Sequence, residues 1–208
     1  MSLVLLASNQ DMHSWKEALL REDPDLDVEI WPDVSSEERV QFAVCWNQPS
    51  NVLNRYPNLK AVSSMGAGVD HILKDDALPK EVTVCRIVSP SLARQMNEYV
   101  LNAVLNYQRN MLTYIYQKQQ GEWNPLPHRS SEDCSIGIMG LGALGKPTAR
   151  LLADMGYKVN GWSKSSKPIT GVQTFSGEDE FGTFLQQTQI LVCMLPLTRE
   201  TRGILDLD

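Results

Sequence analysis

The sequence predicts an α/β protein of two domains, each built on a parallel β-sheet. In about the first hundred residues, short apolar runs alternate with amphipathic runs of helical spacing. This alternation is typical of a parallel sheet that is covered by helices on both faces. Further along, an apolar run leads into the spacing Gly-x-Gly-x-x-Gly, and a helical pattern begins inside it. A chain of 208 residues is long enough for one or two such domains.

Bulk composition excludes several classes of function. The chain is 42% hydrophobic and 21% charged with a formal net charge of −6, and it carries no block of Lys and Arg, so we expect no nucleic-acid partner. Its apolar runs are far shorter than the ~20 residues of a membrane span, so no membrane is expected. The opening residues resemble a strand more than a signal peptide. The cysteines are far apart without C-x-x-C spacing, which favours free thiols in a cytoplasmic protein and no metal site.

The first domain is expected to contain five strands joined by right-handed connections. A helix is predicted over Met12–Arg21, and a short one over Asn51–Tyr56 is closed by Pro57. The predicted strands are Leu3–Ala7, Leu26–Trp31, Val40–Trp46, Leu59–Ser63 and Val82–Ile87.

A longer helix follows. Apolar residues recur at helical spacing from Ser91 to Gln120, which predicts one helix that bridges two domains. Gly121 is expected to end it, and Pro125 and Pro127 to hold the next segment extended. We place the domain boundary near residue 100, which gives domains of residues 1–100 and 101–208.

The second domain is expected to be a dinucleotide-binding fold that is incomplete in this chain. Such a domain has about six strands, whereas only four strand-like runs follow residue 130. One precedes the glycines, and the others are Tyr157–Trp162, Val172–Phe175 and Gln189–Met194; a polar helix is predicted over Glu178–Gln187.

Each glycine of the Gly-x-Gly-x-x-Gly spacing has a role if a dinucleotide binds there. Gly140 would allow the tight strand-to-helix turn, Gly142 the approach of a pyrophosphate, and Gly145 close packing of helix on strand. With Ala143 and Leu144, these residues would place the phosphate charge at a helix N-terminus. The alternative is a glycine-rich turn that binds nothing.

The end of the next strand favours NADP over NAD, although NAD stays possible. An NAD site usually carries Asp or Glu about 20 residues beyond the glycines. Here Trp162 is followed by Ser163, Lys164 and Ser165, and then by Lys167, without a carboxylate. Positive charge and hydroxyls suit a 2′-phosphate better than a bare ribose. The alternative is that these are ordinary solvated loop residues.

Five stretches along the chain carry a family resemblance: Ser64–Ile72, Arg94–Val100, Gly121–Trp123, Ile136–Gly145 and Leu195–Thr198. Taken together and in this order, they resemble the D-isomer-specific 2-hydroxyacid dehydrogenases, and most closely their glyoxylate/hydroxypyruvate reductase branch. The resemblance implies a flavodoxin-like substrate domain, a Rossmann-type domain inserted into it, and an active site in the cleft between them. It also implies reduction of a small 2-oxo acid by hydride from a nicotinamide cofactor, and a homodimer.

The resemblance also assigns substrate-side residues. Gly66, Ala67, Gly68 and Val69 would hold the substrate carboxylate through backbone N–H groups. Without the resemblance, this loop could be a plain strand-to-helix turn. Trp46 would line or cover the substrate, with packing in the core as the alternative.

On the cofactor side, the resemblance places Met96 near the nicotinamide. Leu195, Pro196 and Thr201 would form the loop on that side after the fourth strand. The resemblance also places Glu98 near the nicotinamide, with a charge at the start of a helix as the alternative. Asp70 and His71 are interpreted as structural.

The resemblance implies that an Arg and a His paired with an acid carry the chemistry. In the family, all three lie downstream of the stretch that matches Leu195–Thr198, so the catalytic residues are expected downstream of Asp208. His13, His71 and His128 do not match those positions, and Arg199 and Arg202 come too early. Three hypotheses therefore stay open: the leading portion of an NADPH-dependent reductase, a non-catalytic NADP-binding module, and another Rossmann enzyme such as a methyltransferase.

Overall fold

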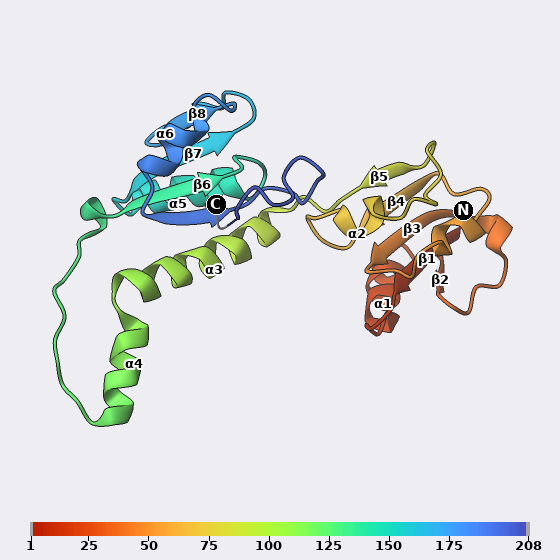
Figure 1. The fold of residues 1–208 in the computed structure, drawn as a ribbon. Helices are drawn as coiled ribbons and strands as arrows, with labels where there is room; N and C mark the ends of the chain where they lie inside the picture. The colour runs from red at the N-terminus through yellow and green to blue at the C-terminus, as the bar shows by residue number, and fades with distance from the viewer. Residues whose placement is uncertain (1, 207–208) are drawn as a thin grey trace. The chain divides into compact units, whose positions relative to one another are not determined.

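The computed structural model describes residues 2–206, which form two compact units (Figure 1). The first unit takes in the chain up to Val88 and again from Pro196 onward, and the second is Ser89–Leu195. The division lies just before helix α3 (Pro90–Gln108), whereas residue 100, near which the boundary was expected, lies inside that helix. All of α3 therefore belongs to the second unit.

The first unit is a five-stranded sheet with the order β2-β1-β3-β4-β5, in which every pair is parallel. This is the flavodoxin-like order, so the predicted fold class is confirmed. The helices are α1 (His13–Glu22) and the short α2 (Asp70–Leu73), which was not predicted; the segment after Asn51 forms a 3₁₀ turn, Val52–Arg55. The strands are β1 (Ser2–Ala7), β2 (Asp27–Ile30), β3 (Val40–Trp46), β4 (Ala61–Ser64) and β5 (Thr83–Cys85).

Both faces of this sheet are buried, as the nearly continuous apolar character of β1 requires. Successive side chains of a strand point to opposite faces. Val4 and Leu6 belong to a core cluster on one face, and Leu3 and Leu5 to a second cluster with Met12. The central strands are therefore held by packed side chains on both faces of the sheet.

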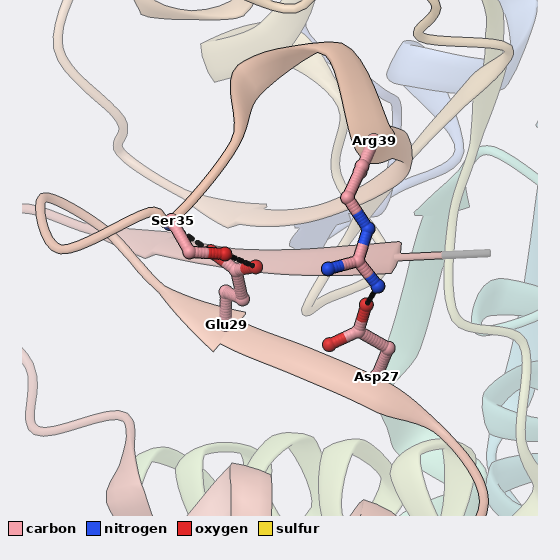
Figure 2. Close-up of polar contacts among 4 residues, drawn as sticks. All are labelled: Asp27, Glu29, Ser35 and Arg39. Atoms are coloured by element: carbon pink, nitrogen blue, oxygen red, sulfur yellow. Dashed lines mark hydrogen bonds and ion pairs between the residues drawn. The ribbon is translucent and has the colours of Figure 1, made fainter.

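The edge strand β2 is protected by the segment that follows it (Figure 2). The hydroxyl of Ser35 donates to Glu29 at 2.6 Å, and the guanidinium of Arg39 pairs with Asp27 at 2.6 Å. The ion pair is largely exposed and contributes little to stability. Its effect is to hold charged side chains along an edge that would otherwise present unpaired backbone groups to another strand.

The second unit carries a four-stranded parallel sheet with the order β8-β7-β6-β9. This is the order of the first four strands of a doubly wound dinucleotide-binding sheet, as predicted. Its core gathers side chains of β6, β7 and helix α5 with Val100 and Val104 of α3. The elements are β6 (Ser135–Met139), α5 (Gly145–Asp154), β7 (Lys158–Ser163), β8 (Gln173–Ser176), α6 (Phe181–Gln186) and β9 (Ile190–Cys193).

The prediction of one continuous helix over Ser91–Gln120 is wrong. The chain forms α3 and α4 (Met111–Gln120), and Figure 1 shows it turning sharply between them. Asn110 lies between the helices in the left-handed region with a φ of 54°, a conformation that asparagine tolerates better than most residues. Gly121 ends α4, as expected. None of the helices in the described part of the chain has the length and hydropathy of a membrane-spanning segment.

Candidate functional site

The turn between β6 and α5 requires glycine at two of its three glycine positions. Gly140 has a φ of +98°, and a Cβ there would lie 2.9 Å from the carbonyl group of Met194. A Cβ on Gly145 would lie 1.9 Å from the carbonyl oxygen of Gly140. Because these neighbours are backbone atoms, neither position has room for a side chain.

Gly142 is different, because the fold itself does not require a glycine there. A Cβ at this position would meet nothing within 4 Å, and its φ lies outside the left-handed region. Gly142 and Ala143 are both exposed at the surface of the turn. An open, exposed glycine beside a helix N-terminus is the arrangement that lets a ligand phosphate approach the backbone closely.

The N-terminus of α5 is available to an anion. Leu144 occupies the N-cap position without a side-chain hydrogen bond, and the first turn holds no acidic residue. The positive end of the helix dipole is therefore not compensated by a side chain of the chain's own first turn.

The carboxyl end of β7 lies at the same edge of the sheet as this turn, because Met139 of β6 pairs with Trp162. Trp162 is buried, and its indole N–H donates to the carbonyl oxygen of Gly177 at 2.8 Å. The chain then reaches the surface, where Lys164, Ser165 and Lys167 are exposed.

The structure changes the part expected of Ser163. Its side chain is buried, and its hydroxyl donates to the carbonyl oxygen of Ser165 at 2.7 Å. This hydrogen is thus engaged inside the turn rather than offered to a phosphate, and Ser163 shapes the loop that presents Lys164 and Ser165.

Leu195 lies against the glycine turn, and Met96 belongs to the same unit. The backbone nitrogen of Leu195 is 3.1 Å from the position of a Cβ on Gly140. Met96 is half-buried on α3 and packs against the core of the second unit. Pro196 and Thr201 belong to the first unit, where the Thr201 hydroxyl donates to the Pro196 carbonyl oxygen at 2.5 Å.

In the first unit, the Gly66–Val69 loop connects β4 with α2. The N–H of Gly66 is engaged within the chain itself, because it donates to the hydroxyl of Ser64 at 3.1 Å. The N–H groups of Ala67, Gly68 and Val69 donate to no group among the described residues. These three amides therefore have no hydrogen-bond acceptor of their own within the described part of the chain.

Two neighbours of this loop were not found by sequence reasoning. Arg86 donates from Nη1 to the carbonyl oxygen of Ala67 at 3.2 Å and brings a positive charge to the loop. The second neighbour is a buried polar group made by Gln48, Ser64 and His71 beneath the loop. No spacing rule signals either, because the register of β3, β4 and β5 brings them together.

Trp46 lies at the carboxyl end of β3 and covers the loop from one side. Its side chain is 40% exposed, so it is not a core residue. A Cβ on Gly66 would lie 2.8 Å from the Trp46 ring, and the ring centroids of Trp46 and His71 are 5.1 Å apart. A partly exposed aromatic ring thus lies against Gly66 at the start of the loop.

The histidines differ in environment. His13 is exposed and its Nδ1 lies 2.7 Å from the carboxylate of Asp11, while His128 accepts from Arg109 at 2.8 Å. His71 is buried, and burial lowers its pKa from the ordinary value of 6.5. Among residues 2–206, no cluster of three or more His, Cys, Asp or Glu side chains could hold a metal ion.

Sequence comparison identifies a family and several relatives of this chain. Residues 101–208 match the family described as D-isomer specific 2-hydroxyacid dehydrogenase, NAD binding domain. The chain is 38% identical over 197 residues to glyoxylate/hydroxypyruvate reductase A of Serratia proteamaculans, covering 92% of this chain and 63% of that protein. It is 36% identical over 211 residues to the protein of the same name from Enterobacter sp. strain 638, covering 99% of this chain and 67% of that one.

Solved structures of proteins from the same family are similar to this chain. A D-isomer specific 2-hydroxyacid dehydrogenase from Xanthobacter autotrophicus Py2, in complex with NADPH and MES, superimposes with a TM-score of 0.92 at 37% identity. An NADPH-dependent glyoxylate/hydroxypyruvate reductase from Sinorhizobium meliloti, in complex with NADP and sulfate, gives 0.89 at 37% identity. Each comparison covers 99% of this chain and 66% of the other. The chain thus spans about two thirds of the length of its relatives, and it belongs to the D-isomer specific 2-hydroxyacid dehydrogenase family, in the glyoxylate/hydroxypyruvate reductase branch.

Proposed function

We propose that this chain provides the substrate-side unit and the cofactor-binding turn of an NADPH-dependent reductase. Its substrate is a small 2-oxo acid of the glyoxylate or hydroxypyruvate type, and its product is the 2-hydroxy acid. The observation that carries the proposal is the β6–α5 turn, in which Gly140 and Gly145 are required by the fold while Gly142 is left open. The relatives' names support the substrate class.

The cofactor would bind along the carboxyl edge of the second sheet. Its pyrophosphate would lie on the backbone of Gly142 to Gly145, at the uncompensated N-terminus of α5. Its 2′-phosphate would meet Lys164 and Ser165, for which the loop offers positive charge and no carboxylate. When bound, the nicotinamide supplies the hydride. The structures of relatives that hold NADPH or NADP support this choice of cofactor.

The substrate carboxylate would bind to the amides of Ala67, Gly68 and Val69. Fixed N–H groups aimed at an anion cost no reorganisation when the ligand arrives. The guanidinium of Arg86, held on the Ala67 carbonyl oxygen, adds favourable charge. Trp46 would cover the carbon chain of the acid, which excludes water from the carbonyl group.

The groups that polarise the 2-oxo group and deliver the proton are proposed to lie downstream of Asp208. Of the described histidines, only His71 lies at the Gly66–Val69 loop, and it is buried beneath it. We also propose a reducing, cytoplasmic location, because all four cysteines are free thiols.

The cofactor preference is tested by reversing the charge at Lys164. A charge-assisted hydrogen bond to phosphate contributes about 1.5–3 kcal/mol, so Lys164→Asp should shift the ratio of NADPH to NADH affinity by about tenfold or more toward NADH. The measurement is a titration of nicotinamide fluorescence with each cofactor. Lys158→Asp, at the opposite end of β7, is the matched control and should leave the ratio unchanged. Equal affinity for both cofactors in the parent and in Lys164→Asp would refute the assignment.

We further propose that the protein is a homodimer and that α4 forms part of the interface. Large apolar side chains on and beside this helix are exposed in the chain as described. They are Met111 at 41%, Leu112 at 77%, Ile115 at 51%, Tyr116 at 60% and Trp123 at 91% exposure. Several large apolar side chains exposed on one short segment are typical of a protein–protein interface.

The interface is tested by Leu112→Glu. Burying an unpaired carboxylate in an apolar contact is costly, so we expect the dimer dissociation constant to rise by at least about tenfold. Sedimentation velocity over a range of protein concentrations provides the measurement. Leu73→Glu, at an exposed leucine of the first unit, is the control and should leave the dimer intact. A parent chain that stays monomeric at high concentration would contradict the proposal.

A further inference from the structure

Beneath the Gly66–Val69 loop lies a closed set of hydrogen bonds among buried side chains. Ser64 is 0% exposed, His71 4% and Gln48 6%. The Oγ of Ser64 is 3.0 Å from Nε2 of His71, and Nδ1 of His71 is 3.0 Å from Oε1 of Gln48. The amide nitrogen of Gln48 donates to the backbone carbonyl oxygen of His71, also at 3.0 Å.

These contacts determine which nitrogen of the neutral imidazole carries the hydrogen. A carbonyl oxygen only accepts, so the Gln48 group that faces the His71 carbonyl must be its NH₂. The Gln48 oxygen therefore faces Nδ1, and Nδ1 must carry the hydrogen. Nε2 is then the acceptor of the neutral ring, and the hydroxyl of Ser64 donates to it. The opposite tautomer would set two acceptors against each other in a buried site, which is costly.

The Ser64 hydroxyl also forms a hydrogen bond with the loop. Because its hydrogen points to His71, its lone pairs are free to accept the N–H of Gly66 at 3.1 Å. That bond fixes the peptide plane at the start of the loop, while Arg86 fixes the carbonyl of Ala67. Trp46 packs on both the His71 ring and Gly66.

We propose that His71 is a positioning residue. As the neutral Nδ1–H tautomer, it orients the Ser64 hydroxyl, which accepts a hydrogen bond from the Gly66 N–H. The next three amides are then left to bind a carboxylate. This inference rests on the proposed function of the loop. A loop that is held in its binding geometry before the ligand arrives loses less conformational entropy on binding. Burial also lowers the pKa of His71, which favours the neutral ring that this arrangement needs.

The test uses the chain itself labelled with ¹⁵N and oxalate as the probe, since oxalate is a small acid with a carboxylate beside a second carbonyl carbon. The ring nitrogens of His71 should show the neutral Nδ1–H form at neutral pH. Oxalate should shift the amide signals of Ala67, Gly68 and Val69 much more than that of Gly66.

Two variants separate positioning from mere packing. Ser64→Ala removes the hydroxyl, and loss of one such hydrogen bond should raise the oxalate dissociation constant about tenfold. His71→Phe keeps a ring against Trp46 but cannot accept from Ser64, and it should give a similar rise. The double variant should be no weaker than either single one, because both act through the same bond. Ser63→Ala, at the neighbouring serine of β4, is the matched control and should bind oxalate like the parent.

The outcomes are distinct. An Nε2–H tautomer, parent-like oxalate affinity in Ser64→Ala, or additive losses in the double variant would overturn the positioning role alone, with the anion site intact. A parent chain whose loop amides do not respond to oxalate would overturn the proposed function of the loop and this inference with it. A well-dispersed spectrum in each variant shows that the fold is retained.

Discussion

Replacing Gly145 with alanine is expected to destabilise the second unit and to abolish NADPH binding. The new Cβ would lie 1.9 Å from the carbonyl oxygen of Gly140 and 3.0 Å from its carbonyl carbon. These atoms form the turn itself and have no flexible end that could move aside. The start of α5 would have to shift away from β6, at a cost of about 2–4 kcal/mol in the free energy of unfolding, typical of a severe steric conflict in a core.

Gly142→Ala is the matched comparison, because a methyl group there meets nothing within 4 Å. Its free energy of unfolding should stay within about 0.5 kcal/mol of the parent. NADPH affinity should nevertheless fall by about tenfold or more, since the methyl group would occupy the approach of the pyrophosphate. Urea denaturation and nicotinamide fluorescence measure the two quantities separately. Full NADPH affinity in Gly142→Ala would mean that the turn is structural and binds no pyrophosphate.

The second large effect is expected at the substrate loop. Gly68→Pro removes one of the three amides that donate to no other described group, and its ring restricts the backbone of the loop. We expect kcat/KM for glyoxylate and hydroxypyruvate to fall by about a hundredfold or more, as when an anion-binding donor is lost from an active site. The assay requires a polypeptide that continues past Asp208 over the length of the relatives.

NADPH affinity is the internal control for this variant, because Gly68 and the glycine turn belong to different units. It should stay near that of the parent. If Gly68→Pro retained the parent kcat/KM, the loop would be only a connection between β4 and α2.

The fold was predictable because its signals are local. Short apolar runs separated by amphipathic helical runs located the strands, and the glycine spacing between β6 and α5 identified the dinucleotide-binding unit. The break between α3 and α4 was missed because apolar residues keep their helical spacing through Asn110. What fixes the break is tertiary: Gln108, at the end of α3, is buried and bonded to the carbonyl oxygen of Arg129 and to the hydroxyl of Tyr157.

The candidate site was predictable only as far as its backbone. The sequence indicated which glycines form the turn and the loop. It did not indicate that Gly142 is the open one of the three turn glycines, or that the Gly66 amide is already engaged. Arg86 reaches the loop because β5 pairs with β4, a contact that depends on register rather than on spacing. The hydroxyl of Ser163 illustrates the same limit, since a serine near a phosphate-binding loop can as easily bond to its own turn.

NADPH-dependent reduction of hydroxypyruvate, followed as loss of nicotinamide absorbance, tests the central claim most directly. It should be measured with residues 1–208 and with a polypeptide that continues past Asp208, both of verified mass. We predict that the longer polypeptide turns over hydroxypyruvate and glyoxylate with NADPH, and that residues 1–208 show no turnover. Turnover by residues 1–208 at the rate of the longer polypeptide would show that the catalytic groups lie within this chain. A longer polypeptide that binds NADPH but reduces no 2-oxo acid would make the protein a cofactor-binding module instead of a reductase.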